Sequence, residues 1–538
     1  MGIKLGKSSF PSGHSPTDFK CFGPPATKDG EFDSCKIADL GCFTQDGKDS
    51  NKCYHGAICK SNINQKWYVY FEWGRTGATN NAFQFIECSD EADAQEEFKD
   101  QLLSKNLKRG TWQTVAGLKV LRPRVSAKTG KADDLYVVRP MATRSVGLPD
   151  GKTISHNEGA KAKSSPVAII SKAAGRTVDQ QTMKLMQDLK VGNQVYTRTS
   201  IVGGAIPAQS AIDEVRHLLQ EAQKRVGKLG SATVDQQVAD KELRDITSLV
   251  YSRVPKTKPV GAPDSTWILS GNNIMAWNQD LDAFEQALYS SAQTVQTVSD
   301  PFDGMAVDME WVNPASDLGK FLYTWWPNAT RNVHGHIGSM KIKNAWKLER
   351  HDDRGKIEKY MRAVHPECNG CKERPIKQPS ERSDLRLAGF SNDDIKAFKD
   401  SNTSLLFHGT RSVNVPGIMR TSFRLPAELV GVVITGAMFG GGIYFADDWK
   451  KSAGYTSLSG GYYSSGAGGV AGRGAFMFAC DTVLGEAHVA SGPKGYTGTP
   501  KGTHCIFGKA GHSGVQNNEW ITFKKESTKL RYLVEFSV

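Results

Sequence analysis

The chain has 538 residues, of which 39% are hydrophobic and 23% charged, and its formal net charge is +12. This composition is typical of a soluble globular protein, and no apolar run approaches the roughly 18 residues of a membrane span, so we expect no membrane-spanning segment. The length predicts about three or four domains, and the positive charge favours a polyanionic partner such as nucleic acid.

The first 50 residues are rich in Gly, Pro, Ser, Asp and Lys and show no periodicity. We expect residues 1–50 to be loosely ordered, and their start lacks the apolar stretch of a secretory signal. Cys21, Cys35 and Cys42 lie here without a CxxC spacing, so no metal site is predicted. The cysteines of the chain are expected to be free thiols in a reducing compartment.

Residues 51–112 predict a small α+β domain. The stretch KWYVYFEWGRTG is aromatic and β-branched and breaks at Gly74 and Gly77, and residues 83–87 predict a further strand. A helix should follow, with Ser89 as the candidate N-cap, because acidic residues fill the next turns.

Residues 113–175 are predicted to be a basic connector rich in Gly, Lys and Ser, with one short apolar stretch, DLYVV. From residue 176 the apolar period becomes helical, which predicts an all-helical domain over 176–300. The apolar stripes comprise Ile212, Val215, Leu219, Ala222 and Val226, then Leu243, Ile246 and Val250, then Ile274, Trp277, Leu281, Phe284 and Leu288.

Residues 301–538 are predicted to be rich in strands, because MAVDMEW and MKIKNAWKL alternate and LLFHGTR is a short apolar run ending at His408. Residues 351–400 look like an insertion whose role the sequence leaves open. The insertion contains Cys368 and Cys371, a CxxC pair without an obvious second pair, so no metal is predicted there either.

The stretch MFGGGIYFADDWKKSAGY combines three consecutive glycines with Tyr444, Ser452 and Tyr455. Glycine lets the backbone approach a ligand closely, and tyrosine rings can stack on a flat aromatic group. Each residue also has a simpler explanation: Tyr444 in a core, Ser452 as a helix N-cap, and Tyr455 as a cover for apolar surface. Glu519, at the start of the strand pattern EWITF, would ordinarily be solvated.

Taken together and in this order, LLFHGTR, GAMFGGGIYFADDWKKSAGY and NNEW resemble the catalytic domain of the poly(ADP-ribose) polymerases. KWYVYFEWGRTG resembles the WGR domain, and the helices from 176 resemble the regulatory helical domain of the DNA-dependent members. The resemblance covers residues 50–538 and implies a multidomain α+β fold. Its parts are a WGR domain (51–112), the basic connector (113–175), a regulatory helical domain (176–300) and a β-rich ADP-ribosyltransferase catalytic domain (301–538).

The resemblance implies that NAD is the substrate and that no metal takes part. It assigns the catalytic triad associated with chain elongation to His408, Tyr444 and Glu519. The residues that it assigns to NAD binding are His408, Gly409, Thr410, Arg424, Tyr444, Ser452 and Tyr455. It assigns DNA binding to Trp73 and Arg75, where the indole can stack on an exposed sugar or base and the guanidinium can contact phosphate.

The chemistry of this reaction suits a carboxylate such as Glu519. Cleavage of the bond between nicotinamide and ribose creates oxocarbenium character at the anomeric carbon, which a negative charge near the 2′-hydroxyl stabilises. The nicotinamide is already cationic and departs neutral, so neither a metal nor a strong general acid is required.

The function implied is a polymerase of ADP-ribose that DNA ends or breaks stimulate and that modifies protein acceptors, including itself. A nuclear location is implied if the source is eukaryotic, and a cytoplasmic one otherwise. Two alternatives remain: a mono-ADP-ribosyltransferase of the same fold, and a DNA-end-binding scaffold with an inert catalytic domain. The sequence leaves the acceptors and the preferred DNA lesion open, and residues 485–519 look shorter than in the long-loop members.

Overall fold

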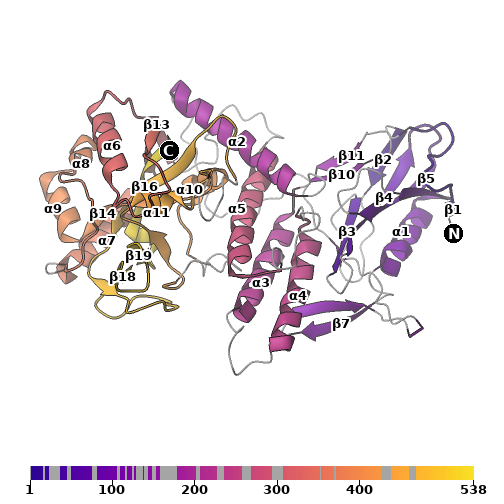
Figure 1. Cartoon of the computed structure of the whole chain (residues 1–538). Coiled ribbons are helices and arrows are strands. Elements are labelled where there is room, and N and C mark those ends of the chain that lie inside the picture. The colour runs from indigo at the N-terminus through magenta and orange to yellow at the C-terminus, as the bar shows by residue number, and fades with distance from the viewer. Residues whose placement is uncertain are drawn as a thin grey trace. The chain divides into compact units, whose positions relative to one another are not determined.

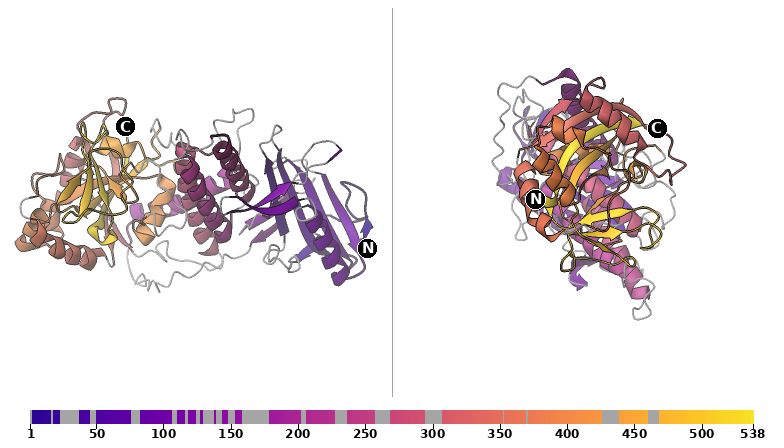
Figure 2. Two further views of the ribbon diagram at one scale, coloured as in Figure 1. Left: turned by 90° about the horizontal axis from the view of Figure 1, so that it is seen from below. Right: turned by 90° about the vertical axis from the view of Figure 1, so that its left-hand side faces the viewer.

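A computed structural model gives the structure of the chain (Figure 1), with further views in Figure 2. It describes residues 2–15, 18–22, 37–44, 50–75, 82–105, 110–115, 118–123, 127–128, 137–138, 143–147, 153–157, 178–201, 206–226, 236–256, 268–293, 307–351, 353–368, 371–425, 438–459 and 468–538. These form two compact units. Unit 1 comprises residues 1–163, 197–274 and 287–295, and unit 2 comprises 164–196, 275–286 and 296–538.

The main element of unit 1 is a seven-stranded antiparallel sheet in the order β1-β6-β5-β4-β3-β9, with β2 also paired to β4. Its strands are β1 (Ile3–Lys4), β2 (Phe19–Phe22), β3 (Ile37–Thr44), β4 (Ser50–Ser61), β5 (Trp67–Arg75), β6 (Ala82–Cys88) and β9 (Val137–Val138). Helix α1 (Glu91–Lys105) packs Ala94 and Phe98 against one face, where Phe71 lies (Figure 1). The small α+β domain predicted from the aromatic strand pattern is therefore present.

The expectation of a loosely ordered N-terminal segment is wrong for the residues that the structure describes. Leu5, Phe10 and Phe19 pack on the opposite face of the sheet, together with Phe83 and Phe85. Leu5, Phe10 and Phe19 are widely spaced in the sequence, so they produced no periodic signal, yet their burial holds β1 and β2 in place. Cys35 lies outside the described residues.

The predicted connector also contains strands. Two hairpins, β7 (Gly110–Val115) with β8 (Leu118–Pro123) and β10 (Thr143–Gly147) with β11 (Thr153–Asn157), interrupt it. The stretch DLYVV supplies β9, which pairs with β3. The predicted N-cap of α1 was one residue early, because the side chain of Asp90, rather than that of Ser89, accepts the backbone N–H of Asp93 at 2.9 Å.

Four helices follow, as the apolar stripes predict: α2 (Gln180–Ser200), α3 (Gln209–Val226), α4 (Gln236–Arg253) and α5 (Gly271–Gln293). Apart from Val226, which is half-buried, every residue of those stripes is buried. Helices α3 and α4 belong to unit 1, whereas α2 and α5 contribute residues to both units. Among the described helices, none combines the length and the apolar character needed to cross a membrane.

Unit 2 is built on two sheets. The first is antiparallel in the order β12-β13-β20-β16-β14, and the second has the order β15-β19-β18-β17. The strands are β12 (Val307–Trp311), β13 (Lys341–Arg350), β14 (Thr403–Gly409), β15 (Ile443–Phe445), β16 (Ala475–Val483), β17 (Ala487–Val489), β18 (Cys505–Gly508), β19 (Glu519–Thr522) and β20 (Thr528–Ser537).

Alternate side chains of the first sheet enter two different cores, which is why its central strand β16 is buried throughout. Phe476 and Phe478 face the second sheet with Trp520, whereas Met477 faces α6 (Asp317–Asn328) with Trp326. The predicted insertion forms α7 (Asp353–Val364), α8 (Ser383–Leu387) and α9 (Asn392–Asp400). Two short helices, α10 (Val415–Thr421) and α11 (Trp449–Ala453), follow β14 and β15.

The packing of α1 on its sheet gives a test of unit 1. Phe98 is 1% exposed, and its ring stacks on Phe71 with a centroid separation of 5.8 Å. We expect Phe98→Ala to lower the free energy of unfolding by about 3–5 kcal/mol, because it leaves a cavity under the helix. Glu96→Ala, on the exposed side of α1, should stay within about 0.5 kcal/mol. Denaturant unfolding monitored by hydrogen exchange in β4 and β5 measures both, and equal values would contradict this packing.

Candidate active site

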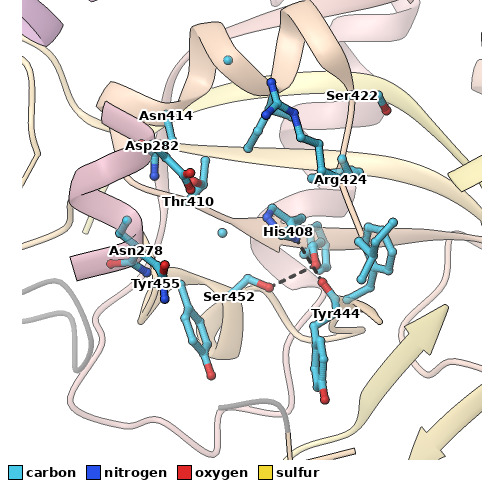
Figure 3. Close-up of a pocket in the computed structure, with 18 of the residues that line it drawn as sticks. Asn278, Asp282, His408, Thr410, Asn414, Ser422, Arg424, Tyr444, Ser452 and Tyr455 are labelled. Atoms are coloured by element: carbon cyan, nitrogen blue, oxygen red, sulfur yellow. Dashed lines mark hydrogen bonds between the residues drawn. The ribbon is translucent and has the colours of Figure 1, made fainter. Parts of the chain in front are cut away.

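A cavity of about 300 Å³ lies in unit 2, between the ends of β14, β15 and β19 and the helices α5, α10 and α11 (Figure 3). It brings together every residue that the sequence analysis assigned to catalysis or NAD binding. Those residues are His408, Gly409, Thr410, Arg424, Tyr444, Ser452, Tyr455 and Glu519. Their proximity is a fact of the fold, and their roles stay a prediction.

Gly409 and Ser452 pack against each other where β14 ends. A Cβ atom at position 409 would collide with the backbone oxygen of Ser452, so only glycine lets β14 and α11 meet this closely. The Ser452 hydroxyl donates a hydrogen bond to the Phe407 carbonyl at 3.2 Å. Ser452 is not the N-cap of its helix, since Asp448 caps α11.

His408 is held in an apolar wall of the cavity. Its Nδ1 donates to the Tyr444 carbonyl at 3.0 Å, which leaves Nε2 as the acceptor nitrogen of the neutral ring. The rings of Phe423 and Phe445 lie 4.4 and 5.9 Å away. Burial lowers the pKa of His408 to about 4, and the hydrogen bond to Tyr444 offsets this only in part. The imidazole is therefore neutral near pH 7.

Tyr444 is fixed through its hydroxyl, which accepts from the Phe439 N–H at 3.0 Å and donates to the Gly440 carbonyl at 2.8 Å. Burial raises the pKa of the Tyr444 phenol, so it too is neutral. The glycines beside Tyr444 are required by the backbone conformation and the packing of the protein. Gly440 has φ +92°, and Gly442 lies where a Cβ would collide with Ile521. We expected these glycines to bring the backbone against a ligand; Gly442 lines the cavity, whereas the space beside Gly440 is filled by Tyr496.

Glu519 and Lys451 form a buried ion pair in the cavity. The Lys451 ammonium lies 2.7 Å from Oε1 of Glu519 and donates to the Tyr455 hydroxyl at 3.2 Å. Burial works against the charged lysine, but Tyr455 and Glu519 more than compensate and raise the pKa of Lys451. Oε2 of Glu519 is buried and has no hydrogen-bond partner within the parts of the chain that the structure describes. One oxygen of the carboxylate is thus paired, and the other is left without a partner on the side chain that lines the cavity.

The polar face of α5 is a part of the cavity that the sequence analysis missed. Figure 3 shows Asn278 and Asp282 across the cavity from Arg424 and Tyr444, and Gln279, Glu285 and Gln286 also line it. Arg424 pairs with Glu285 at 3.6 Å. A signal existed, because residues 278, 282, 285 and 286 recur at helical spacing beside the apolar stripe. Such a face ordinarily indicates contact with solvent.

The remaining predicted residues lie elsewhere. Trp73 and Arg75 are at the end of β5 in unit 1, where the Trp73 ring stacks on Tyr54 with a centroid separation of 6.3 Å. Cys368 and Cys371 are buried in an apolar cluster of unit 2. Among the described residues, no group of three or more His, Cys, Asp or Glu side chains has an arrangement that could hold a metal ion.

Comparison with known families gives two matches. Residues 351–514 match the poly(ADP-ribose) polymerase catalytic domain, and residues 41–116 match the WGR domain. The chain is 22% identical to poly(ADP-ribose) polymerase 1 of Arabidopsis thaliana and 21% identical to that of Xenopus laevis, over 89% and 88% of its length. It spans only 41% of either relative. Poly(ADP-ribose) polymerase 2-A of Oryza sativa subsp. japonica is 40% identical over 16% of this chain and 11% of its own length.

The environment of His408 leads to a test by titration. Because its pKa lies near 4, the ring should stay neutral from pH 8 down to about 5. In this pH range a proton binds His408 more readily in the unfolded chain than in the folded one. The free energy of unfolding should therefore fall as the pH falls from about 6.5 to 4. NMR of the histidine ring protons measures the titration, and the unfolded protein in denaturant gives the reference for an unperturbed histidine, about 6.5. A His408 signal of the folded protein that titrates at this reference value would show that the ring is not enclosed.

Proposed function

From the premise that this chain carries the catalytic domain of the poly(ADP-ribose) polymerase family and a WGR domain, we propose that it is an NAD+ ADP-ribosyltransferase. The observation that carries the proposal is the half-satisfied carboxylate of Glu519. It is 6% exposed, paired on one side with Lys451, and lies in the same cavity as His408, Gly409 and Ser452. A buried carboxylate with one unpartnered oxygen costs free energy, and a hydrogen bond from a ligand to that oxygen would offset the cost.

NAD would enter the cavity with its nicotinamide end over Gly409. The backbone groups of Gly409 and the Ser452 hydroxyl would bind the carboxamide, while Tyr444 and Tyr455 would lie against the ring. The acceptor nitrogen Nε2 of His408 would receive a hydrogen bond from a ribose hydroxyl of the adenosine half. Thr410 and Arg424 would contact the same half, with the guanidinium near the phosphates or adenine.

In the reaction, the bond between the anomeric carbon and the nicotinamide nitrogen breaks, and its electron pair stays with the nicotinamide, which leaves neutral. Glu519 Oε2 would accept the 2′-hydroxyl and stabilise the positive charge on the ribose. An acceptor side chain then attacks the anomeric carbon and releases its proton. The Lys451 ammonium, 2.7 Å from Oε1, stays paired with the carboxylate on the side away from the ribose.

The finer proposal is that the enzyme elongates its product on protein acceptors, including itself. Its support is that His408, Tyr444 and Glu519 all line the cavity, which is the arrangement associated with elongation. A mono-ADP-ribosyltransferase remains the second candidate, and gel analysis of products from labelled NAD separates them: a ladder indicates polymer, and one discrete shift indicates single transfer.

DNA ends or breaks are the proposed stimulus, with the WGR domain as the binding module and the basic stretch from Lys105 to Lys163 adding salt-sensitive affinity. The polar residues of α5 that line the cavity support a regulatory role for the helical segment, which would restrain NAD access until DNA loosens it. If the source is eukaryotic, the nucleus is the proposed location. The competing candidate is a DNA-end-binding scaffold without turnover, and NAD consumption with and without broken DNA decides between them.

Substitution of the carboxylate tests the chemistry. Glu519→Gln keeps the shape and hydrogen-bonding capacity of the side chain but removes its negative charge. We expect NAD affinity to change little while the transfer rate falls on the order of 10²–10³-fold and elongation is lost. Initial rates and product gels at saturating NAD measure this, and polymer formed at the wild-type rate would refute the role given to Glu519.

Substitutions in unit 1 test the activation separately. Trp73→Ala with Arg75→Ala removes a stacking surface and a phosphate contact but no group of the cavity. We expect the stimulation by a blunt duplex, about 5- to 150-fold for coupling of the usual size, to disappear, while basal NAD turnover remains. Salt must be fixed, because phosphate contacts make every DNA effect salt-dependent. Full stimulation of the double variant would transfer the activation role to the basic stretch from Lys105 to Lys163.

A further inference from the structure

Asp447 is a buried aspartate of unit 2 that does not line the cavity. It follows β15, is 1% exposed, and receives three hydrogen bonds on a single oxygen, Oδ2. The donors are the Ile376 N–H at 3.0 Å, the Asn518 side-chain amide at 3.0 Å and the Trp520 indole N–H at 3.2 Å. Three donors from two distant parts of the chain thus converge on one carboxylate.

Two of these donors flank Glu519 in the sequence. Side chains alternate along an extended strand, so Asn518 and Trp520 point to the opposite side from Glu519. Trp520 is further fixed by stacking on Phe507, with ring centroids 3.9 Å apart, and Asn518 accepts the Ala510 N–H at 3.1 Å. Holding both neighbours fixes the direction in which the Glu519 side chain leaves the backbone.

This arrangement costs stability. Oδ1 of Asp447 is buried without a hydrogen-bond partner among the residues that the structure describes. Burial also raises the pKa of Asp447, even though the bonds from Asn518, Ile376 and Trp520 favour the ionised form. An apolar side chain in this place would avoid the desolvation of the carboxylate but would leave the three donors without a partner. The carboxylate therefore matters here as the common partner of Ile376, Asn518 and Trp520.

The third donor connects Asp447 to the insertion whose role the sequence left open. Ile376 belongs to a short segment, residues 376–378, which we call the brace. At its other end Gln378 accepts the Leu405 N–H at 2.9 Å and donates to the Leu405 carbonyl at 3.0 Å. Leu405 lies in β14, three residues before His408. The brace thus ties the strand that ends in His408 and Gly409 to the carboxylate that holds the neighbours of Glu519.

We propose that Asp447, held by the brace, is a positioning residue that sets the Glu519 carboxylate in register with the end of β14. Asp447 does not line the cavity, so it acts through Asn518 and Trp520 rather than on a ligand. The catalytic consequence rests on the proposed function, whereas the placement of Glu519 beside Lys451 does not.

The kinetic test compares two buried aspartates of unit 2. Asp447→Ala should lower kcat about 10- to 100-fold with KM for NAD within about 3-fold, because the carboxylate loses its position while the rest of the cavity stays. In a Glu519→Gln background the same change should cost nothing further, since the charge it positions is absent. Equal losses in the two backgrounds would overturn the proposal.

Asp384→Ala is the matched control. Asp384 is 1% exposed and binds Arg382 at 2.8 Å and the Tyr532 hydroxyl at 3.0 Å, but it does not line the cavity. Its loss should lower thermal stability and leave the kcat of the folded protein within about 3-fold. A fall in kcat equal to that of Asp447→Ala would mean that any buried aspartate of this unit matters alike, and would overturn the specific role.

A crystal structure of Asp447→Ala provides a readout that needs no turnover. We expect the Lys451–Glu519 ion pair to open, with Gly409 and Ser452 unmoved; an unmoved carboxylate would overturn the proposal. If the wild-type protein consumes no NAD but the carboxylate moves, the proposed function fails and the positioning role stands. Should Asp447→Ala not fold, Trp520→Phe removes a single donor and keeps the stacking ring. It should lower kcat about 3- to 10-fold, and an unchanged kcat would contradict the proposal.

Discussion

A buried negative charge imposes the main constraint on this cavity. Glu519 sits at the start of β19, almost without exposure, and its charge is tolerable because the Lys451 ammonium meets one oxygen at 2.7 Å. The two partners come from different elements, α11 and β19, so the pair exists only when α11 on β14 and β19 on β15 are both in register. The fold offsets the cost of burying the charge by placing Lys451 beside it. The charge in turn gives the cavity a group that can stabilise a cation.

Two of the side chains that line the cavity together with this pair are kept neutral, which strengthens its electrostatic effect. Burial lowers the pKa of His408 and raises that of the Tyr444 phenol, so neither side chain is charged near pH 7. A neutral wall does not screen the carboxylate as water would, and electrostatic interactions are stronger where the dielectric is low. A cationic ribose formed against this wall would therefore interact with Glu519 more strongly than in solvent.

The sequence singled out these cavity residues because each stands in a contiguous motif within or beside a strand: His408 after LLF, Tyr444 within GIYF, Glu519 before WITF. The sequence did not predict which side chains form hydrogen bonds with one another across the fold. That Asp447 receives Asn518 and Trp520 depends on the pairing of β15 with β19, which no local pattern reports. The polar residues of α5 were missed for another reason, because a polar stripe beside an apolar one normally faces solvent. The N-terminal strands were not predicted because Leu5, Phe10 and Phe19 are too widely spaced to show a period.

Helix α5 is attached to the cavity unevenly. Near its middle, Asp280 pairs with Arg411 at 2.7 Å, and both side chains are only 5% exposed. Removing one partner of such a buried pair typically costs about 3–5 kcal/mol. Further along, Glu285 meets Arg424 at 3.6 Å, and the arginine is 31% exposed, so that contact is weak. Of these two ion pairs, the buried one therefore contributes more to holding this part of α5 against the residues that follow β14.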